Sequence, residues 1–226
     1  MYQSIKYELQ FFSNWHLGSG LSVGADMDAT TIKDENGLPY VPGRTLKGII
    51  RDAAQLLVDN EYSGFDQAFM DRVFGYNDQE RRSQLIEAKT EQEKTAAFKA
   101  LDEAAKSEEV ETLESLVHYQ QQAFFSNAYL SKFLADSLLN EGSKRQARLF
   151  QRISSTAIDG QNGIAKNTSL RTIEVCIPLS VYGVIDNVAE EDVEQLTKVL
   201  QAIKSMGQSR HRGLGRIAFT ILKSQK

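Results

Sequence analysis

Residues 37–51 read GLPYVPGRTLKGIIR, and this stretch determines where the first helix can begin. It opens with two glycines and two prolines, at positions 37, 39, 42 and 43. Because proline restricts its own φ angle and disfavours the helical conformation in the preceding residue, this part should be extended and turning. From Leu46 onward, apolar residues recur at spacings of three and four, which predicts an amphipathic helix with one face in the core.

Three cations, Arg44, Lys47 and Arg51, form a stripe beside the apolar face of this helix. The helix can therefore pack against a core while it offers three positive charges and free N-terminal amide groups to a phosphate. The alternative is that the stripe is an ordinary solvated helix face.

The whole string resembles the signature of the RAMP superfamily of CRISPR-associated proteins, which is G-x-P-x-(I/V)-P-G-(S/T)-S/T-L-K-G-x-x-R. Arg44 stands where a small hydroxyl residue is usual, which adds charge and leaves the backbone requirements unchanged. The positions that match are Gly37, Pro39, Pro42, Gly43, Thr45, Leu46, Lys47, Gly48 and Arg51.

The composition fits one domain spanning residues 1–226. The chain has 226 residues and is 41% hydrophobic, enough for one sizeable core and an inserted lobe. No apolar run approaches the roughly 18 residues of a membrane span, and the N-terminus does not read as a signal peptide. A lone cysteine, Cys176, lies in an apolar run and argues against disulfides or zinc. We therefore expect a cytoplasmic protein without a membrane partner.

Charge is unevenly distributed along the chain. The net charge is −4, but residues 78–117 alone hold eleven acidic and six basic residues, so the rest of the chain sums to +1. Residues 144–171 carry six Lys and Arg against one Asp, and residues 204–216 carry four and no acid. Two basic segments of this kind are typical of a surface that binds a polyanion.

Residues 5–11 alternate between apolar and polar side chains, which predicts a half-buried first strand. A loop over residues 14–24 follows, with Gly18 and Gly20 at turns. The loop is not a phosphate-binding P-loop, because it lacks the P-loop lysine. It does resemble a Gly-Ser-Gly segment that RAMP proteins often carry after their first strand.

Residues 25–36 hold four acids, and such loop carboxylates are usually solvated. The resemblance implies more for one of them. In type III effector backbone subunits, an aspartate needed for cutting target RNA lies about six residues before the acid that precedes Gly-Leu-Pro. Asp34 matches that acid, so Asp28 matches the catalytic aspartate, with Asp26 as the alternative if the register slips. One carboxylate is a weak metal site, so we expect Mg²⁺ or another divalent ion to bind Asp28 loosely and to share phosphate oxygens.

The central part of the chain predicts a short helix, an insertion and a strand. Residues 65–75 continue an apolar helical pattern and end at a glycine, and residues 76–122 read as a charged helical insertion. Residues 123–130 are expected to form a strand with Phe124 and Phe125 in the core. Asn127 replaces the aspartate that RAMP proteins commonly carry at this point.

Residues 158–174, IDGQNGIAKNTSLRTIE, are similar to the family segment I-D-R-x-T-G-x-A…L-R-x-x-E. The resemblance implies a β-hairpin thumb, over about 145–172, that reaches across guide RNA and interrupts its pairing with target. Gly160 stands where an arginine is usual, and Lys166 and neighbouring arginines are the candidates to replace the phosphate contact of that arginine.

The C-terminal third predicts a strand over 175–185, broken near Pro178, and a helix over 187–206. Asn187 and Glu190 have the spacing of a capping box for that helix. A glycine- and arginine-rich turn then leads into a last strand, with alternating apolar residues from 217 to 221, and the family has a similar loop here. The element order predicts an α+β, ferredoxin-like (RRM-like) β-α-β-β-α-β core with a helical insertion and a thumb.

The resemblance implies a subunit that binds CRISPR guide RNA (crRNA) and target RNA in a type III effector complex of antiviral defence. Its partners would be neighbouring copies, other RAMP subunits and the large signature subunit. The residues expected to contact RNA are Arg44, Thr45, Lys47, Arg51, Lys166, Arg171, Arg210, His211, Arg212 and Arg216. Those expected to shape backbone turns are Gly18, Gly20, Pro42, Gly43, Gly48, Gly213 and Gly215.

Three functions remain open at this point. The first is a backbone subunit that is also a metal-dependent endoribonuclease, with Asp28 as its catalytic residue. The second is the same scaffold without catalysis. The third is a guide-processing endoribonuclease with His16 as general base, which ranks last because His16 lacks an evident partner. His118 falls in the charged insertion and is expected to be exposed.

Overall fold

The computed structural model describes residues 1–20, 27–75, 122–140, 142–160, 164–166 and 169–222. Asp26, His118 and nearly all of the expected 76–122 insertion lie outside the described residues. The predictions made for them therefore stay predictions.

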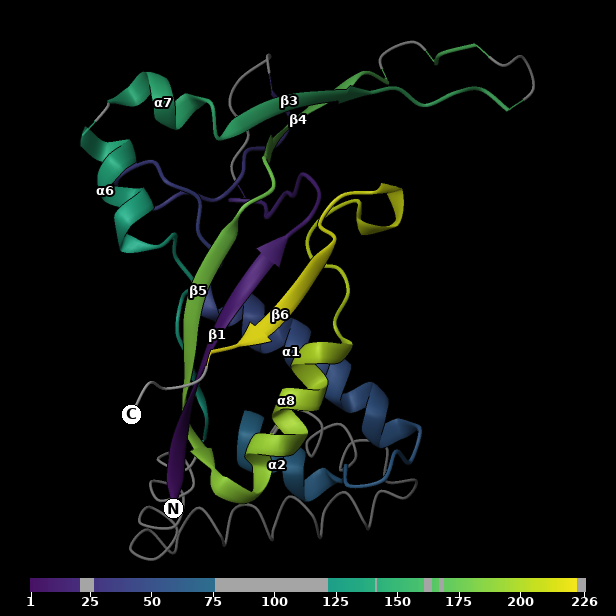
Figure 1. The fold of residues 1–226 in the computed structure, drawn as a ribbon. Helices are drawn as coiled ribbons and strands as arrows, with labels where there is room; N and C mark the ends of the chain where they lie inside the picture. The colour runs from purple at the N-terminus through teal and green to yellow at the C-terminus, as the bar shows by residue number, and fades with distance from the viewer. Residues whose placement is uncertain (21–26, 76–121, 141, 161–163, 167–168, 223–226) are drawn as a thin grey trace, which may run out of the picture.

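The described core is a four-stranded antiparallel sheet with helices between its strands (Figure 1). Its strands are β1 (Tyr2–Phe11), β2 (Phe124–Phe125), β5 (Ser180–Ala189) and β6 (Ile217–Ile221), in the order β2-β5-β1-β6. Helix α1 (Gly43–Asp59) follows β1, and helix α8 (Val193–Ala202) connects β5 to β6. The core elements thus follow one another as β-α-β-β-α-β, and the predicted α+β class is confirmed.

The helices cover one face of this sheet. Along β1, Ile5, Tyr7, Leu9 and Phe11 are buried, whereas the intervening residues are half-buried or exposed, as the alternation predicted. The buried residues belong to one apolar cluster with side chains from α1 and α8, which include Leu46, Ile50, Ala54, Leu196 and Leu200. Helix α2 (Gln67–Phe74) contributes Phe69 and Phe74 to the same cluster.

A second, two-stranded sheet projects from the upper end of the body (Figure 1). It consists of β3 (Phe150–Ser155) and β4 (Arg171–Cys176), paired antiparallel from Phe150 opposite Cys176 to Ser155 opposite Arg171. Two short helices, α6 (Lys132–Asn140) and α7 (Ser143–Ala147), precede it. The described 3-10 turns are η2 (Glu190–Asp192) and η3 (Arg210–Arg212).

The structure corrects the expected helix over 187–206. Strand β5 continues to Ala189, and α8 begins only at Val193, after η2. Asn187 has a positive φ of 59°, and its side-chain amide donates a hydrogen bond to the Gln122 carbonyl oxygen instead of capping a helix. The capping-box pattern was wrong because this asparagine side chain serves a contact that is distant in sequence.

Two strand predictions need smaller corrections. The break near Pro178 is confirmed, since β4 ends at Cys176 and β5 begins at Ser180. The strand expected over 123–130 is reduced to the two residues of β2. Its phenylalanines differ: Phe125 is buried, but Phe124 is 63% exposed, because successive residues of a strand point to opposite faces.

Cys176 is buried at the end of β4, and burial raises the pKa of its thiol. Among the described helices, none is both long and apolar enough to cross a membrane.

Candidate nucleic-acid interface

Three segments that are far apart in the sequence meet at the base of the β3–β4 hairpin. They are residues 13–18, the hairpin strand β4 and residues 206–216, and residues 13–18 lie between the other two. Trp15 exchanges two backbone hydrogen bonds with Cys176 of the hairpin, at 2.9 and 2.8 Å. On its other side, Gly215 donates to the Asn14 carbonyl oxygen at 2.8 Å, and Gln208 donates to that of His16 at 2.9 Å. The glycine loop that begins at residue 14, the hairpin base and the loop over residues 206–216, here called the arginine-rich loop, are therefore joined by backbone hydrogen bonds.

Asp28 lies against the base of the hairpin. Its backbone amide donates to the Thr172 carbonyl oxygen at 2.9 Å, and the Thr172 amide donates to the Asp28 carboxylate at 2.7 Å. The following residues of the two segments are paired in the same way, since the Glu174 amide donates to the Ala29 carbonyl oxygen at 2.9 Å. The Asp28 side chain is nevertheless exposed, so the carboxylate is held in place and accessible.

Glu174 stabilises the contact between the hairpin and the segment that contains Asp28. This role was not predicted from the sequence. One carboxylate oxygen accepts the Thr31 amide at 3.2 Å, and the other pairs with the Lys33 ammonium at 3.0 Å. The Glu174 carbonyl oxygen accepts the Thr31 hydroxyl at 2.9 Å. Glu174 is the last matching residue of the segment resembling the family's thumb, and that was the only signal for it in the sequence.

His16 cannot serve as a general base toward RNA, because its side chain is only 1% exposed. Its Nδ1 donates a hydrogen bond to the Glu174 carbonyl oxygen, since a carbonyl can only accept. Its Nε2 has no hydrogen-bond partner within the described part of the chain. His16 belongs to the packing under the hairpin, which contradicts its candidate role in guide processing.

The N-terminus of α1 packs tightly on β2. The Gly43 amide donates to the Asn127 side-chain oxygen at 2.8 Å, and a Cβ atom at Gly43 would lie 2.0 Å from the Phe125 carbonyl oxygen. The Thr45 amide donates to the Pro42 carbonyl oxygen at 3.0 Å. The expectation of free amide groups is therefore wrong for Gly43 and Thr45, and Asn127 acts as a helix-capping residue.

The cationic stripe on α1 is partly covered. Arg44 is exposed, whereas Lys47 and Arg51 are half-buried. Burial lowers the pKa of Lys47, and the neighbouring Arg51 charge lowers it further. Gly48 lies in the interior of α1 and not at a turn, contrary to expectation, and a Cβ atom there would meet nothing within 4 Å.

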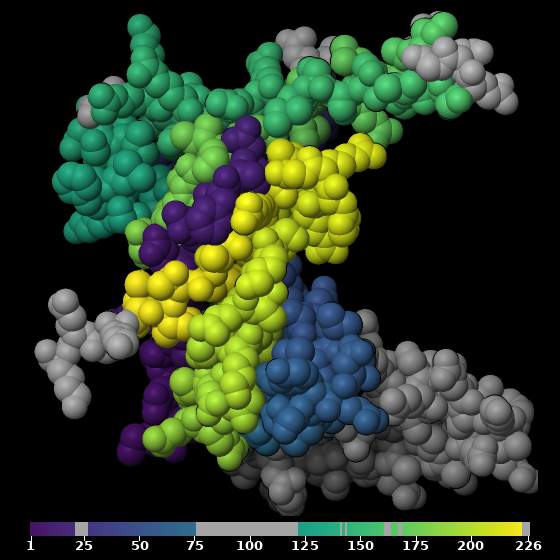
Figure 2. All heavy atoms as spheres, turned by 45° about the vertical axis from the view of Figure 1, so that its right-hand side comes forward, coloured from purple at the N-terminus to yellow at the C-terminus, as the bar shows by residue number. Residues whose placement is uncertain are grey.

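The remaining predicted RNA contacts are exposed and lie on the hairpin or the arginine-rich loop. Lys166 and Arg171 belong to the hairpin, and Arg210, His211 and Arg212 form η3. In Figure 2 the hairpin extends past the body above the yellow segment that contains η3. The loop needs glycine at two points: Gly213 has φ 88°, and Gly215 has φ 66° with the Met206 carbonyl oxygen 1.8 Å from an added Cβ.

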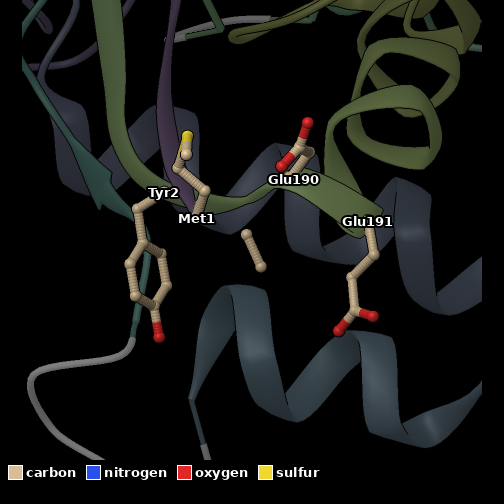
Figure 3. Close-up of a pocket in the computed structure, with 5 residues that line it drawn as sticks. Met1, Tyr2, Glu190 and Glu191 are labelled. Atoms are coloured by element: carbon tan, nitrogen blue, oxygen red, sulfur yellow. The ribbon is translucent and has the colours of Figure 1, made fainter.

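A pocket of about 550 Å³ lies near the N-terminus (Figure 3). Figure 1 places the N-terminus at the end of the sheet opposite the hairpin. Met1, Tyr2, Ala189, Glu190 and Glu191 line it. None of these residues belongs to the segments that meet at the hairpin base, so the pocket is separate from the interface described above.

A comparison with protein families supports one assignment. The sequence model of the RAMP superfamily matches residues 8–218. The chain belongs to the RAMP superfamily.

Solved structures share the fold of this RAMP protein. A chain in the cryo-EM structure of the Type III-B Cmr-beta bound to cognate target RNA is 13% identical, with a TM-score of 0.56, covering 97% of each chain. The Type III-B Cmr-beta structure in the apo state gives 13% identity and a TM-score of 0.55, covering 98% of each chain. No curated protein matches the chain.

The RAMP protein offers a divalent cation few ligands of its own. Among the residues that the structure describes, no three His, Cys, Asp or Glu side chains cluster closely enough to hold a metal ion. Asp28 presents an exposed carboxylate, the ligand type that Mg²⁺ prefers. These residues fit a cation that keeps most of its ligands as water or substrate oxygens.

Proposed function

We propose that this RAMP protein is a guide-RNA-binding backbone subunit of a CRISPR type III effector complex, and that it cuts target RNA with Asp28. Its partners would be guide RNA, target RNA, neighbouring copies, other RAMP subunits and the large signature subunit. The family assignment and the fold shared with Type III-B Cmr-beta support the subunit class.

The position of Asp28 carries the proposal. Its carboxylate accepts the Thr172 amide at 2.7 Å, and Thr172 directly follows Arg171, the first residue of β4. A hairpin that crosses guide RNA would distort the target strand at its own base. An exposed carboxylate and a guanidinium at that base would then face the distorted phosphate.

The chemistry needs little from the protein beyond positioning. A target 2′-hydroxyl attacks the adjacent phosphorus as its proton passes to Asp28, and the 5′-oxygen leaves and takes a proton from water, giving a 2′,3′-cyclic phosphate and a 5′-hydroxyl end. The Thr172 amide holds the Asp28 carboxylate in one orientation, and Arg171 stabilises the charge on the phosphate. A divalent cation bound by Asp28 and by phosphate oxygens would supply further charge stabilisation.

The test is cleavage of an end-labelled, guide-complementary RNA by the assembled complex in Mg²⁺. Asp28→Asn keeps an oxygen that can accept the Thr172 amide but removes the charge, so cleavage should fall by at least about 100-fold with guide and target binding unchanged. Glu35→Gln is the matched control, because Glu35 is an exposed carboxylate in the same segment. Asp26→Asn tests the alternative aspartate.

The second candidate is a scaffold that binds RNA without cutting it. The absence of a three-ligand metal cluster among the described residues favours it. Cuts that persist in Asp28→Asn at the native rate would establish this function and refute the catalytic assignment.

A further inference from the structure

Phe12 presents an aromatic ring at the interface that no sequence pattern marked. It directly follows Phe11, the last residue of β1, whose ring is buried and stacks on Trp15 with centroids 4.4 Å apart. Phe12 itself is 50% exposed. The strand therefore anchors one ring in the core and leaves its neighbour on the surface.

Arg216 fixes the position of this exposed residue. The Phe12 amide donates to the Arg216 carbonyl oxygen at 2.8 Å, and the Arg216 amide donates to the Ser13 hydroxyl at 3.0 Å. The Arg216 guanidinium lies 5.9 Å from the centre of the Phe12 ring, within the range of a cation–π contact. One backbone hydrogen bond to Phe12 and one hydrogen bond to the neighbouring Ser13 side chain thus hold an exposed ring and a cation together.

The surroundings of this pair suit a polyanion. Arg210, His211 and Arg212 lie a few residues before Arg216 on the same loop, and the segment 204–216 contains no acid. Two residues after Phe12, the Asn14 side chain donates to Gln151 of β3 at 3.2 Å. Phe12 therefore lies between the arginine-rich loop and the hairpin base, on the surface that the proposed function assigns to RNA.

We propose that Phe12 and Arg216 form a stacking platform for one base of a single-stranded RNA. An exposed aromatic ring beside a cationic groove is the arrangement by which proteins bind single strands of any sequence, because every base has a stacking face. Arg216 contacts the backbone or the base plane, and Phe12 supplies the apolar face. This inference rests on the proposed RNA-binding function and adds a direct contact to it.

The experiment measures binding of the full-length chain to a fluorescein-labelled, unstructured RNA of about 15 nucleotides over a range of salt concentrations. Phe12→Leu keeps an apolar side chain and removes the ring. It should weaken binding about tenfold and leave the salt dependence unchanged, because no phosphate contact is lost. Phe133→Leu is the matched control, since Phe133 is 87% exposed on α6, outside the segments that meet at the hairpin base.

Phe12→Trp provides a second, independent measurement. The chain's single tryptophan, Trp15, is fully buried, so a tryptophan at position 12 is a distinct exposed fluorophore. It should bind RNA as tightly as the native chain, and its fluorescence should be quenched as a base stacks on it.

The outcomes separate the two proposals. If the native chain binds no RNA, the proposed function fails before any variant is compared. If the native chain binds and Phe12→Leu binds equally well, the platform is refuted, and the ring is better explained as a contact with a protein neighbour. The platform is equally refuted if Phe12→Trp is as weak as Phe12→Leu, since the ring would then not be the determinant.

Discussion

Gly43 shows how one residue links the helix that carries cations to the sheet. Its missing side chain lets the start of α1 approach the β2 backbone, where the Phe125 carbonyl oxygen would be 2.0 Å from a Cβ atom. The Asn127 side chain then closes the contact by accepting the Gly43 amide. The signature glycine is needed for this close approach and not for an unusual backbone conformation, since Gly43 is not among the described positive-φ glycines.

This geometry predicts opposite effects for two alanine substitutions in one helix. Gly43→Ala should lower the free energy of unfolding by about 3 kcal/mol, because backbone atoms of β2 must move to admit the methyl group. Gly48→Ala should raise it by about 1 kcal/mol, because Gly48 is exposed inside the helix with open space around it. Urea denaturation of both variants measures the difference, and equal effects would contradict the packing described for Gly43.

At the scale of elements, strand β4 of the hairpin is paired along both of its edges. On one edge β4 pairs with β3, and on the other it pairs with the segment that contains Asp28 and with Trp15. Helix α8 is held at its start by a different contact. There the Arg72 guanidinium on α2 binds the buried Asp192 carboxylate through two nitrogens, at 2.9 and 2.7 Å.

The Arg72–Asp192 pair predicts a stability change that a surface pair should not produce. Hydrogen bonding to Asp192 raises the pKa of Arg72, and Asp192 is only 1% exposed. Arg72→Met leaves this buried carboxylate unpaired, so the free energy of unfolding should fall by about 2 kcal/mol, less than for a fully buried pair because Arg72 is partly exposed.

Lys198→Met is the control for this prediction. It breaks the Lys198–Glu194 contact of 2.7 Å, in which both side chains are more than half exposed. Its effect on the free energy of unfolding should be clearly smaller than that of Arg72→Met, because solvent screens an exposed pair. Equal losses for Arg72→Met and Lys198→Met would show that burial of Asp192 is not what makes the first pair matter.

For the whole molecule, the distribution of charge matters more than its sum. The net charge is −4, yet the hairpin and the arginine-rich loop both carry exposed basic residues, such as Arg171 and Arg212. Affinity for RNA should therefore depend on phosphate contacts and hardly on base sequence.

With about five phosphate contacts, a plot of log K against log salt concentration should have a slope of about −3.5 for single-stranded RNA. Fluorescence anisotropy with two oligonucleotides of unrelated sequence would measure it. Arg212→Gln should make the slope shallower by less than one unit for both sequences. A slope near zero, or strong preference for one sequence, would contradict binding through phosphates.

The sequence by itself determined the elements whose rules are local. Proline and glycine at 39–43 set the start of α1, alternation revealed β1, and Pro178 marked the gap between β4 and β5. These follow from backbone sterics and from the period of side chains along a helix or strand, which act over a few residues. The resemblance of the sequence motifs also predicted the RAMP superfamily, and the comparison with family models confirmed that prediction.

Only the tertiary structure decided which distant residues meet. It placed Asp28 on Thr172, 144 positions away, buried His16 beneath the hairpin, and gave Asn127 and Asn187 partners that no local pattern specifies. The exposure of Phe12 next to the buried Phe11 belongs here too. Such contacts depend on how the whole core packs, because a side chain's partners are set by the elements that burial brings together and not by its neighbours in the chain.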